Sequence, residues 1–180
     1  MDPTRRTFLV VGAAGAAALA LGGFGLALQG TVMREPSQML LALSPREFSI
    51  LAAIADRISP GGEGLPTASE AGVAEKLDEL LYKLDPTVTV ELSQLLRLIE
   101  NALVGLAFDG RVRVFTALSP EEQDRVLEGW RTSRFPLRRA GFKALCGLCN
   151  AVYWATPSTY AHTGYPGPPD FASVVLGGSP

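Results

Sequence analysis

Hydrophobic residues recur at helical spacing over most of the chain after residue 43. The first helix is predicted to begin at Ser44-Pro45-Arg46-Glu47, which combines a capping box with proline at the first helical position. Its apolar stripe is Phe48, Leu51, Ala55 and Ile58. The helix should end at Ser59-Pro60-Gly61-Gly62, because glycine and proline interrupt helices.

Two further helices are predicted in the middle of the chain. A second capping box, Thr67-Ala68-Ser69-Glu70, precedes an apolar stripe of Val73, Leu77, Leu80, Leu81 and Leu84. Asp85-Pro86 then ends this helix and caps the next one. The next stripe runs for about five turns and consists of Val88, Leu92, Leu95, Leu96, Ile99, Leu103 and Leu106. We therefore expect this third helix to lie at the centre of the core.

The C-terminal half contains two more helices and a tail. Ser119-Pro120-Glu121-Glu122 repeats the capping box, and the helix after it places Val126, Leu127 and Trp130 on its inner face. A long helix follows Pro136 and carries in line Phe142, Leu145, Cys146, Cys149 and Tyr153, until Thr156-Pro157 stops it. The segment 108–118 is too short to assign. From Ala161 the density of proline and glycine predicts an extended tail. The fold class is all-α, a compact helical bundle of four to six helices with short loops.

The N-terminus carries the pattern of an export signal. Thr4-Arg5-Arg6-Thr7-Phe8-Leu9 precedes a run without ionisable side chains that continues to Leu28. A hydroxyl residue, the arginine pair Arg5 and Arg6, one variable residue and then Phe8 and Leu9 are typical of a twin-arginine signal. The alternative is a membrane anchor, because the 21 residues from 8 to 28 are long enough to span a bilayer.

Together with the helical pattern, the leader predicts four parts along the chain. Residues 1–29 are a twin-arginine signal peptide or an uncleaved anchor, and 30–42 form a tether. Residues 43–160 form the helical domain, and 161–180 the extended Pro/Gly-rich tail. Cleavage after the small-residue triplet 25–27 and retention of the leader both remain open. In either case we expect an exported protein, located in the periplasm or on the outer face of the cytoplasmic membrane.

The length and charge of the chain argue against some classes of function. The chain has 180 residues, of which 47% are hydrophobic and 19% charged, so one small domain is expected. Beyond residue 29 there are 14 Lys and Arg against 17 Asp and Glu. Nucleic-acid binding is not indicated, because it requires a clustered excess of positive charge.

Groups that could perform chemistry are few. The single histidine, His162, lies in the predicted tail, where no rigid element would orient it as a catalytic base. The acidic residues Glu70, Glu75, Asp78 and Glu79 are interpreted as a solvated face with capping residues. We therefore expect no catalytic residue, metal site or cofactor in this chain.

Cys146 and Cys149 have the spacing of a redox or metal motif but lie on the apolar stripe of a helix. Two interpretations remain for them: buried structural thiols, or an exposed pair that forms a disulfide internally or with a partner.

Late in the chain, aromatic residues and arginines lie close together, a composition that protein interfaces favour. A partner-facing surface is predicted to include Arg134, Arg138, Arg139, Tyr153, Trp154, Tyr165 and Pro166. The alternative is packing of the aromatic residues in the core beside an ordinary solvated face.

An ordered set of motifs resembles the gluconate 2-dehydrogenase subunit 3 family. The resemblance rests on 55–60, 66–73, 118–122 with Trp130 downstream, and 164–168. Thr67 stands where glycine is expected, and the two cysteines have no place in the family pattern. The resemblance implies a helical, cofactor-free subunit bound to a large FAD-containing subunit of the glucose-methanol-choline type, often with a cytochrome c subunit.

This resemblance implies different roles for the two subunits. The large subunit would oxidise a sugar, sugar acid or other alcohol, and this chain would stabilise it and carry the export signal. A free-standing, membrane-anchored helical protein that binds another exported partner is the alternative. A weaker one is a small redox protein that acts through Cys146 and Cys149.

Overall fold

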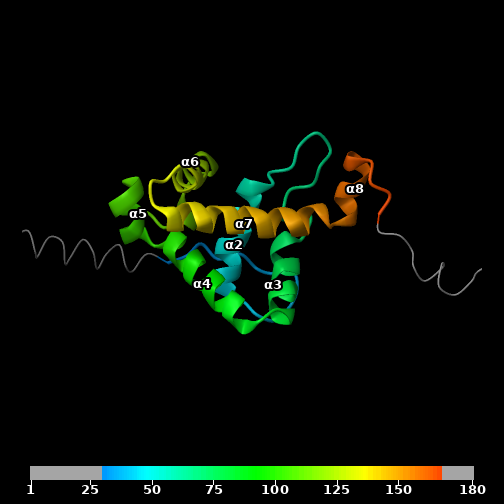
Figure 1. The fold of residues 1–180 in the computed structure, drawn as a ribbon, viewed down its shortest axis with the longest axis horizontal. Helices are drawn as coiled ribbons and strands as arrows, with labels where there is room; N and C mark the ends of the chain where they lie inside the picture. Colours follow the sequence, from blue (N-terminus) through cyan, green and yellow to red (C-terminus); the bar gives the residue numbers. More distant parts are fainter. Residues whose placement is uncertain (1–29, 168–180) are drawn as a thin grey trace, which may run out of the picture.

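The computed structural model describes residues 30–167 and shows a helical bundle (Figure 1). Its seven α-helices are α2 (Pro45–Ile58), α3 (Val73–Lys83), α4 (Pro86–Glu100), α5 (Ala102–Asp109), α6 (Pro120–Arg131), α7 (Pro136–Trp154) and α8 (Pro157–Thr163). A short 3-10 helix, η1 (Phe115–Ala117), lies between α5 and α6. The all-α prediction is confirmed for this part of the chain, but the number of helices exceeds the predicted four to six.

The centre of the core is α2. It contacts α3, α4, α6 and α7, and every residue from Glu47 to Ala55 is buried. The alanines Ala52, Ala53 and Ala55 let neighbouring helices approach closely, so α2 is covered on all sides although its sequence suggested a single stripe. The prediction that the third helix occupies the centre was therefore wrong.

The predicted starts of α2, α4 and α6 are confirmed at their capping residues. The Ser44 side chain accepts a hydrogen bond from the Glu47 backbone N–H, while the Glu47 carboxylate accepts one from the Ser44 backbone. Ser119 and Glu122 form the same reciprocal pair at α6. Asp85 caps α4 by accepting from the Thr87 N–H at 2.8 Å. These local sequence signals thus determine where three helices begin.

The predicted long third helix is broken at Asn101. Asn101 has φ −65° and ψ 120°, which is not helical, and its Oδ1 accepts hydrogen bonds from the N–H groups of Leu103 and Val104. The residue thus ends α4 and caps α5. Because the chain turns there, Leu92, Leu96 and Ile99 are buried while Leu103 and Leu106 are exposed.

The second capping box does not open a helix directly. Thr67 and Glu70 form the expected reciprocal hydrogen bonds, but residues 68–72 are turns and α3 begins at Val73 after Gly72, whose φ is +65°. The turn is attached to α2, because Asp56 accepts hydrogen bonds from the backbone N–H and the hydroxyl of Ser69. Tertiary contacts therefore delay the helix by one and a half turns.

The C-terminal end of the described chain is helical for longer than expected. The stop at Thr156-Pro157 is confirmed for α7, but Pro157 then occupies the first position of α8, where its missing N–H costs nothing. Helix α8 continues to Thr163, so the prediction of extended chain from residue 161 was wrong over its first three residues. Residues 168–180 lie outside the described part.

A buried arginine fixes α5 to the end of α4. The Arg111 guanidinium donates to the backbone oxygens of Ile99 and Asn101, and so satisfies carbonyls at the C-terminus of α4. The same guanidinium lies against Gly105 of α5, at the position that a Cβ atom would occupy. The Arg111 side chain thus fills the space that a side chain at position 105 would occupy, and it links α5 to α4.

Replacing Gly105 by alanine is expected to lower the free energy of unfolding by about 1–3 kcal/mol, because the new methyl group would overlap the buried Arg111 side chain. The matched control is Gly147→Ala in α7, where no atom lies within 4 Å of the added Cβ. That substitution should raise the stability by about 0.5–1 kcal/mol, because alanine favours helix more than glycine does. Urea unfolding measures both variants, and equal stabilities would contradict the role of Arg111.

No helix within residues 30–167 combines the length and the apolar character needed to cross a membrane.

Candidate functional site

The described segment that precedes α2 is attached to the bundle along its length. We call this segment, residues 30–43, the strap. It has no regular secondary structure, yet its backbone and side chains bond to η1, α2 and α3. The sequence predicted a tether here. The structure instead shows that the strap is part of the folded domain.

The last turn of the strap is held by a buried carboxylate. Asp78 of α3 is fully buried, and its two oxygens accept hydrogen bonds from the backbone N–H groups of Leu41, Ala42 and Leu43 at 2.6, 3.0 and 2.7 Å. A carboxylate that receives three backbone donors satisfies groups that cannot pair within a helix or strand. The prediction that Asp78 lies on a solvated face was therefore wrong, whereas its neighbours Glu75 and Glu79 are partly exposed.

The start of the strap is held through a second buried carboxylate. Glu100, the last residue of α4, is fully buried and accepts hydrogen bonds from the backbone N–H and the hydroxyl of Thr116 in η1. The Thr116 hydroxyl oxygen in turn accepts from the backbone N–H of Val32 at 2.9 Å. The chain is therefore fixed to the bundle at Val32, near the first described residue.

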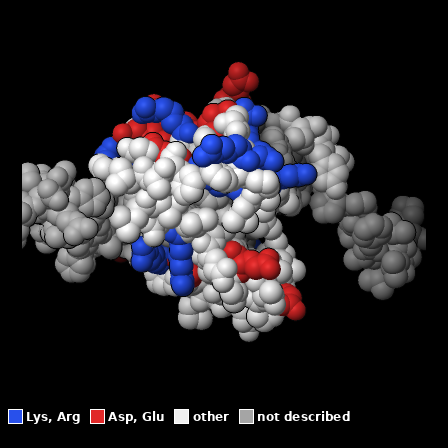
Figure 2. All heavy atoms as spheres, turned by 60° about the vertical axis from the view of Figure 1, so that its left-hand side comes forward, with Lys and Arg blue, Asp and Glu red and all other residues white. Residues whose placement is uncertain are grey.

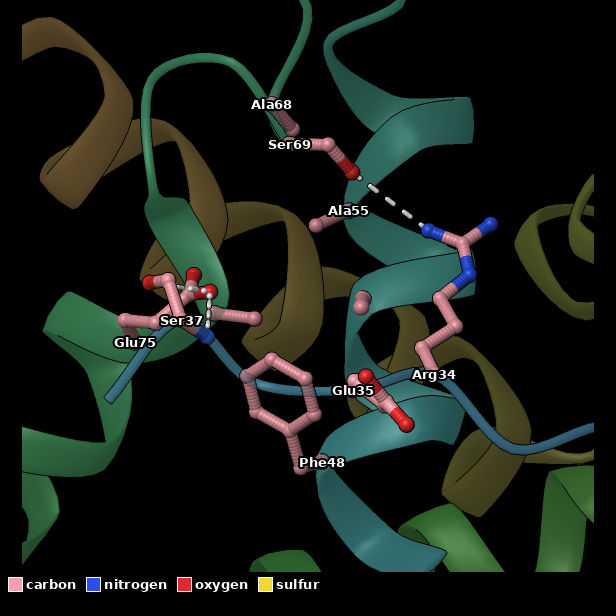
Figure 3. Close-up of a pocket in the computed structure, with 10 residues that line it drawn as sticks. Arg34, Glu35, Ser37, Phe48, Ala55, Ala68, Ser69 and Glu75 are labelled. Atoms are coloured by element: carbon pink, nitrogen blue, oxygen red, sulfur yellow. Dashed lines mark hydrogen bonds between the residues drawn. The ribbon is translucent and has the colours of Figure 1, made fainter. Parts of the chain in front are cut away.

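The middle of the strap crosses a small pocket between α2 and α3 (Figure 3). Arg34 forms an ion pair with Asp56 at 2.6 Å and reaches Ser69, while the hydroxyl of Ser37 donates to Glu75 at 3.1 Å. The pocket has a volume of about 230 Å³, and alanine side chains and Phe48 line much of it. Most of its charged groups bind the strap. The pocket is therefore better suited to holding the strap than to catalysing a reaction.

The two cysteines lie on α7 as free thiols. Cys149 is buried, and this burial, together with the neighbouring Cys146, raises its pKa to about 12. Cys146 is partly exposed, and its burial raises its thiol pKa as well. A redox or nucleophilic role needs an accessible thiolate, and raised pKa values disfavour that form. The geometry thus favours structural thiols.

Native protein at neutral pH is expected to react with a chromogenic disulfide reagent at Cys146 before Cys149. The rate at Cys149 should be at least about tenfold lower, because each unit of raised pKa reduces the thiolate fraction tenfold. Cys146→Ser should remove the fast phase and Cys149→Ser should leave it unchanged. Two fast thiols in the native wild-type chain would contradict the buried position of Cys149.

His162 is exposed on α8 and lies beside Gly64 of the loop before α3. Its position on a helix differs from the predicted tail, but its exposure agrees with a surface histidine. Among the described residues no three His, Cys, Asp or Glu side chains gather closely enough to hold a metal ion.

The predicted partner-facing residues separate into two groups. Arg138 and Tyr153 are turned inward: Arg138 pairs with Asp109 at 2.6 Å, and the Tyr153 hydroxyl donates to the Pro66 backbone oxygen at 2.7 Å. Five of the residues remain on the surface, namely Arg134, Arg139, Trp154, Tyr165 and Pro166. The inward residues fix α7 to its neighbours, so only the exposed group is accessible to a partner.

The signal residues Arg5, Arg6, Phe8 and Leu9 lie outside the described residues. The residues that anchor the strap were not predicted from the sequence. One signal was present for Asp78, because it stands on the same helical face as Ala74, Leu77 and Leu81. An acidic residue in the middle of a buried face indicates a partner from outside the helix.

Comparison with known proteins places the chain in a family. The family model described as gluconate 2-dehydrogenase subunit 3 matches residues 45–167 of the chain. Neither a curated protein nor a solved structure shows significant similarity to it. The match covers α2 to α8 and ends where the described residues end, and the strap lies before it.

Proposed function

Because this chain belongs to the gluconate 2-dehydrogenase subunit 3 family, which comprises small subunits of dehydrogenase complexes, we propose that it is the non-catalytic small subunit of an exported FAD-dependent dehydrogenase. It supplies the twin-arginine signal for the complex and stabilises the large flavoprotein subunit. The large subunit is of the glucose-methanol-choline type and oxidises a sugar or another alcohol in the periplasm or at the membrane.

The attachment of the strap is the observation that supports this proposal most. The twin-arginine route moves proteins that have already folded, and a subunit that escorts a folded partner must keep its own signal joined to a folded body. Here the chain is fixed at Val32 by Thr116 and Glu100, and again at residues 41–43 by Asp78. Unfolding of the strap would break these bonds, so the signal is coupled to the folded state of the bundle.

We assign FAD to the partner because the described residues form a helical bundle and not the fold typical of dinucleotide binding. Dinucleotide sites of this kind use a parallel sheet with a glycine-rich first turn. Residues 30–167 form helices, and their pairing of extended chain is limited to the single bridge between Gly62 and Leu65. A haem c, if the complex has one, belongs to a cytochrome subunit by the same proposal.

Purification of the chain from its native host through a C-terminal tag tests the proposal. The expected result is a yellow complex in which a flavoprotein of large-subunit size accompanies the chain in equal amounts. Recovery of a colourless chain alone under gentle conditions would contradict it and favour the free-standing binding protein.

Exchange of the leader tests the escort role separately. Replacing Arg5 and Arg6 by lysine should leave the flavoprotein in the cytoplasm. In a second variant the leader is replaced by a signal for export of unfolded chains, which should carry the small chain out without its partner. If the flavoprotein reaches the periplasm in both cases, the escort role is wrong even when the complex itself is real.

A further inference from the structure

Helix α5 is apolar on nearly all its sides but lies on the surface. Its sequence is Ala-Leu-Val-Gly-Leu-Ala-Phe-Asp, with a single charged residue, Asp109. Leu103, Leu106 and Phe108 are between 41 and 50% exposed. A helix that is apolar all round is normally buried, so α5 is expected to be covered by something outside the described residues.

The beginning of α7 extends the exposed apolar area. The rings of Phe108 and Phe135 pack edge to face with centroids 5.4 Å apart, and Leu137 beside them is 72% exposed. We call the combined area the α5–α7 face; its residues are Leu103, Leu106, Phe108, Val112, Phe135 and Leu137. Figure 2 brings this end of the bundle forward and shows a broad uncharged area with charged residues of both signs at its margins.

A buried ion pair holds the two helices of the face in place. Arg138 of α7 pairs with Asp109 of α5 at 2.6 Å, and both side chains are about nine-tenths buried. The Arg138 guanidinium also lies over the rings of Phe108 and Trp130, 5.2 and 5.0 Å from their centroids. The face is therefore preorganised, which lowers the entropy lost when a partner binds.

Several cations at the start of α7 have no carboxylate partner among the described residues. Arg134 lies over the Phe135 ring at 4.9 Å, and in the described part of the chain neither Arg134 nor Arg139 nor Lys143 forms an ion pair with a carboxylate. The sequence from Gly129 to Pro169 contains no Asp or Glu, so a neutralising carboxylate must come from elsewhere. A partner with acidic side chains around an apolar centre would complement this charge.

We propose that the α5–α7 face is the surface through which this chain binds the large flavoprotein subunit, and that the matching surface is apolar at its centre and acidic at its margin. The inference rests on the proposed function. Rigid aromatic residues beside arginine are the composition of energetic centres in protein interfaces, which favours a protein over a lipid surface as the occupant. The C-terminal residues Trp154 and Tyr165 then lie outside the energetic centre.

The test uses the tagged full-length chain in its native host, with the flavoprotein that accompanies the wild-type chain as the probe. Leu106→Asp, Leu137→Asp and the double variant Arg134→Glu with Arg139→Glu each alter exposed positions. Each should reduce the flavin recovered per chain by about tenfold or more, as expected for the centre of an interface. Tyr82→Asp and Lys83→Glu, exposed at the far end of α3, are the matched controls and should retain wild-type recovery.

Melting curves of each purified variant exclude loss of fold, since exposed substitutions should leave the melting temperature near that of the wild type. Wild-type recovery of flavin in all three face variants would overturn the proposal while leaving the accessory function standing. The proposal is also overturned if the variants keep the flavoprotein but leave the membrane fraction, which would assign the face to lipid. If the variants retain the flavoprotein but lose self-association, the α5–α7 face would instead bind a second copy of this chain, and the proposal would be overturned. A wild-type chain without any flavoprotein would overturn the proposed function itself.

Discussion

Replacing Asp78 by alanine is expected to lower the free energy of unfolding by about 3–5 kcal/mol. The substitution removes the acceptor for three backbone N–H groups, of Leu41, Ala42 and Leu43, and leaves a cavity beside α3. Unpaired buried donors each cost about 1–3 kcal/mol, but detachment of the strap would let water reach them and so limits the total. The strap should therefore separate before the bundle unfolds.

Urea unfolding measures the loss of stability, and limited trypsin digestion reports the strap. In the Asp78→Ala variant, cleavage after Arg34 should become fast while the helices stay protected. The matched control is Glu79→Ala at the next position, whose carboxylate binds only the Gln38 side chain at 2.7 Å. Its stability should stay within about 0.5 kcal/mol of the wild type. If the two variants were equally stable and equally protected, Asp78 would not anchor the strap.

Reversal of charge at Arg138 is expected to cost about 3–5 kcal/mol of stability, because it breaks a buried ion pair and leaves Asp109 with only the longer contact to Arg111 at 3.8 Å. Asp109 is about 10% exposed and would face a second buried carboxylate in place of the guanidinium. The stacking of the guanidinium on Phe108 and Trp130 would also be lost. Arg138→Glu should therefore loosen α5 from α7 and abolish partner binding through loss of fold.

The neighbouring residue provides the control. Arg139 is exposed and donates only to the backbone oxygen of Ser133, so Arg139→Glu should change stability by no more than about 0.5 kcal/mol. Thermal unfolding of both variants distinguishes them. Equal melting temperatures would mean that the Arg138–Asp109 pair does not hold α5 in place. This comparison also shows why a charge reversal at Arg138 alone cannot test an interface.

Local sequence signals predicted the starts of three helices and the faces they bury. Ser44, Asp85 and Ser119 cap their helices with bonds that reach no further than three residues, so the pattern is complete within the local sequence. The inner faces of α6 and α7 followed from helical spacing, because Val126, Trp130 and Leu145 are buried as expected. The family was also predictable, since its motifs are short and ordered along the chain.

The sequence alone determined that this protein is a small helical bundle of a known family, and the twin-arginine leader stays a prediction from the sequence. Only the tertiary structure decided which helix is central, that Asn101 divides the third helix, and that the strap belongs to the domain. Asp78 and Arg138 are the clearest cases, because their partners Leu43 and Asp109 lie 35 and 29 residues away. A polar residue on a helix looks alike in sequence whether water or a distant backbone group satisfies it, and only packing tells the two apart.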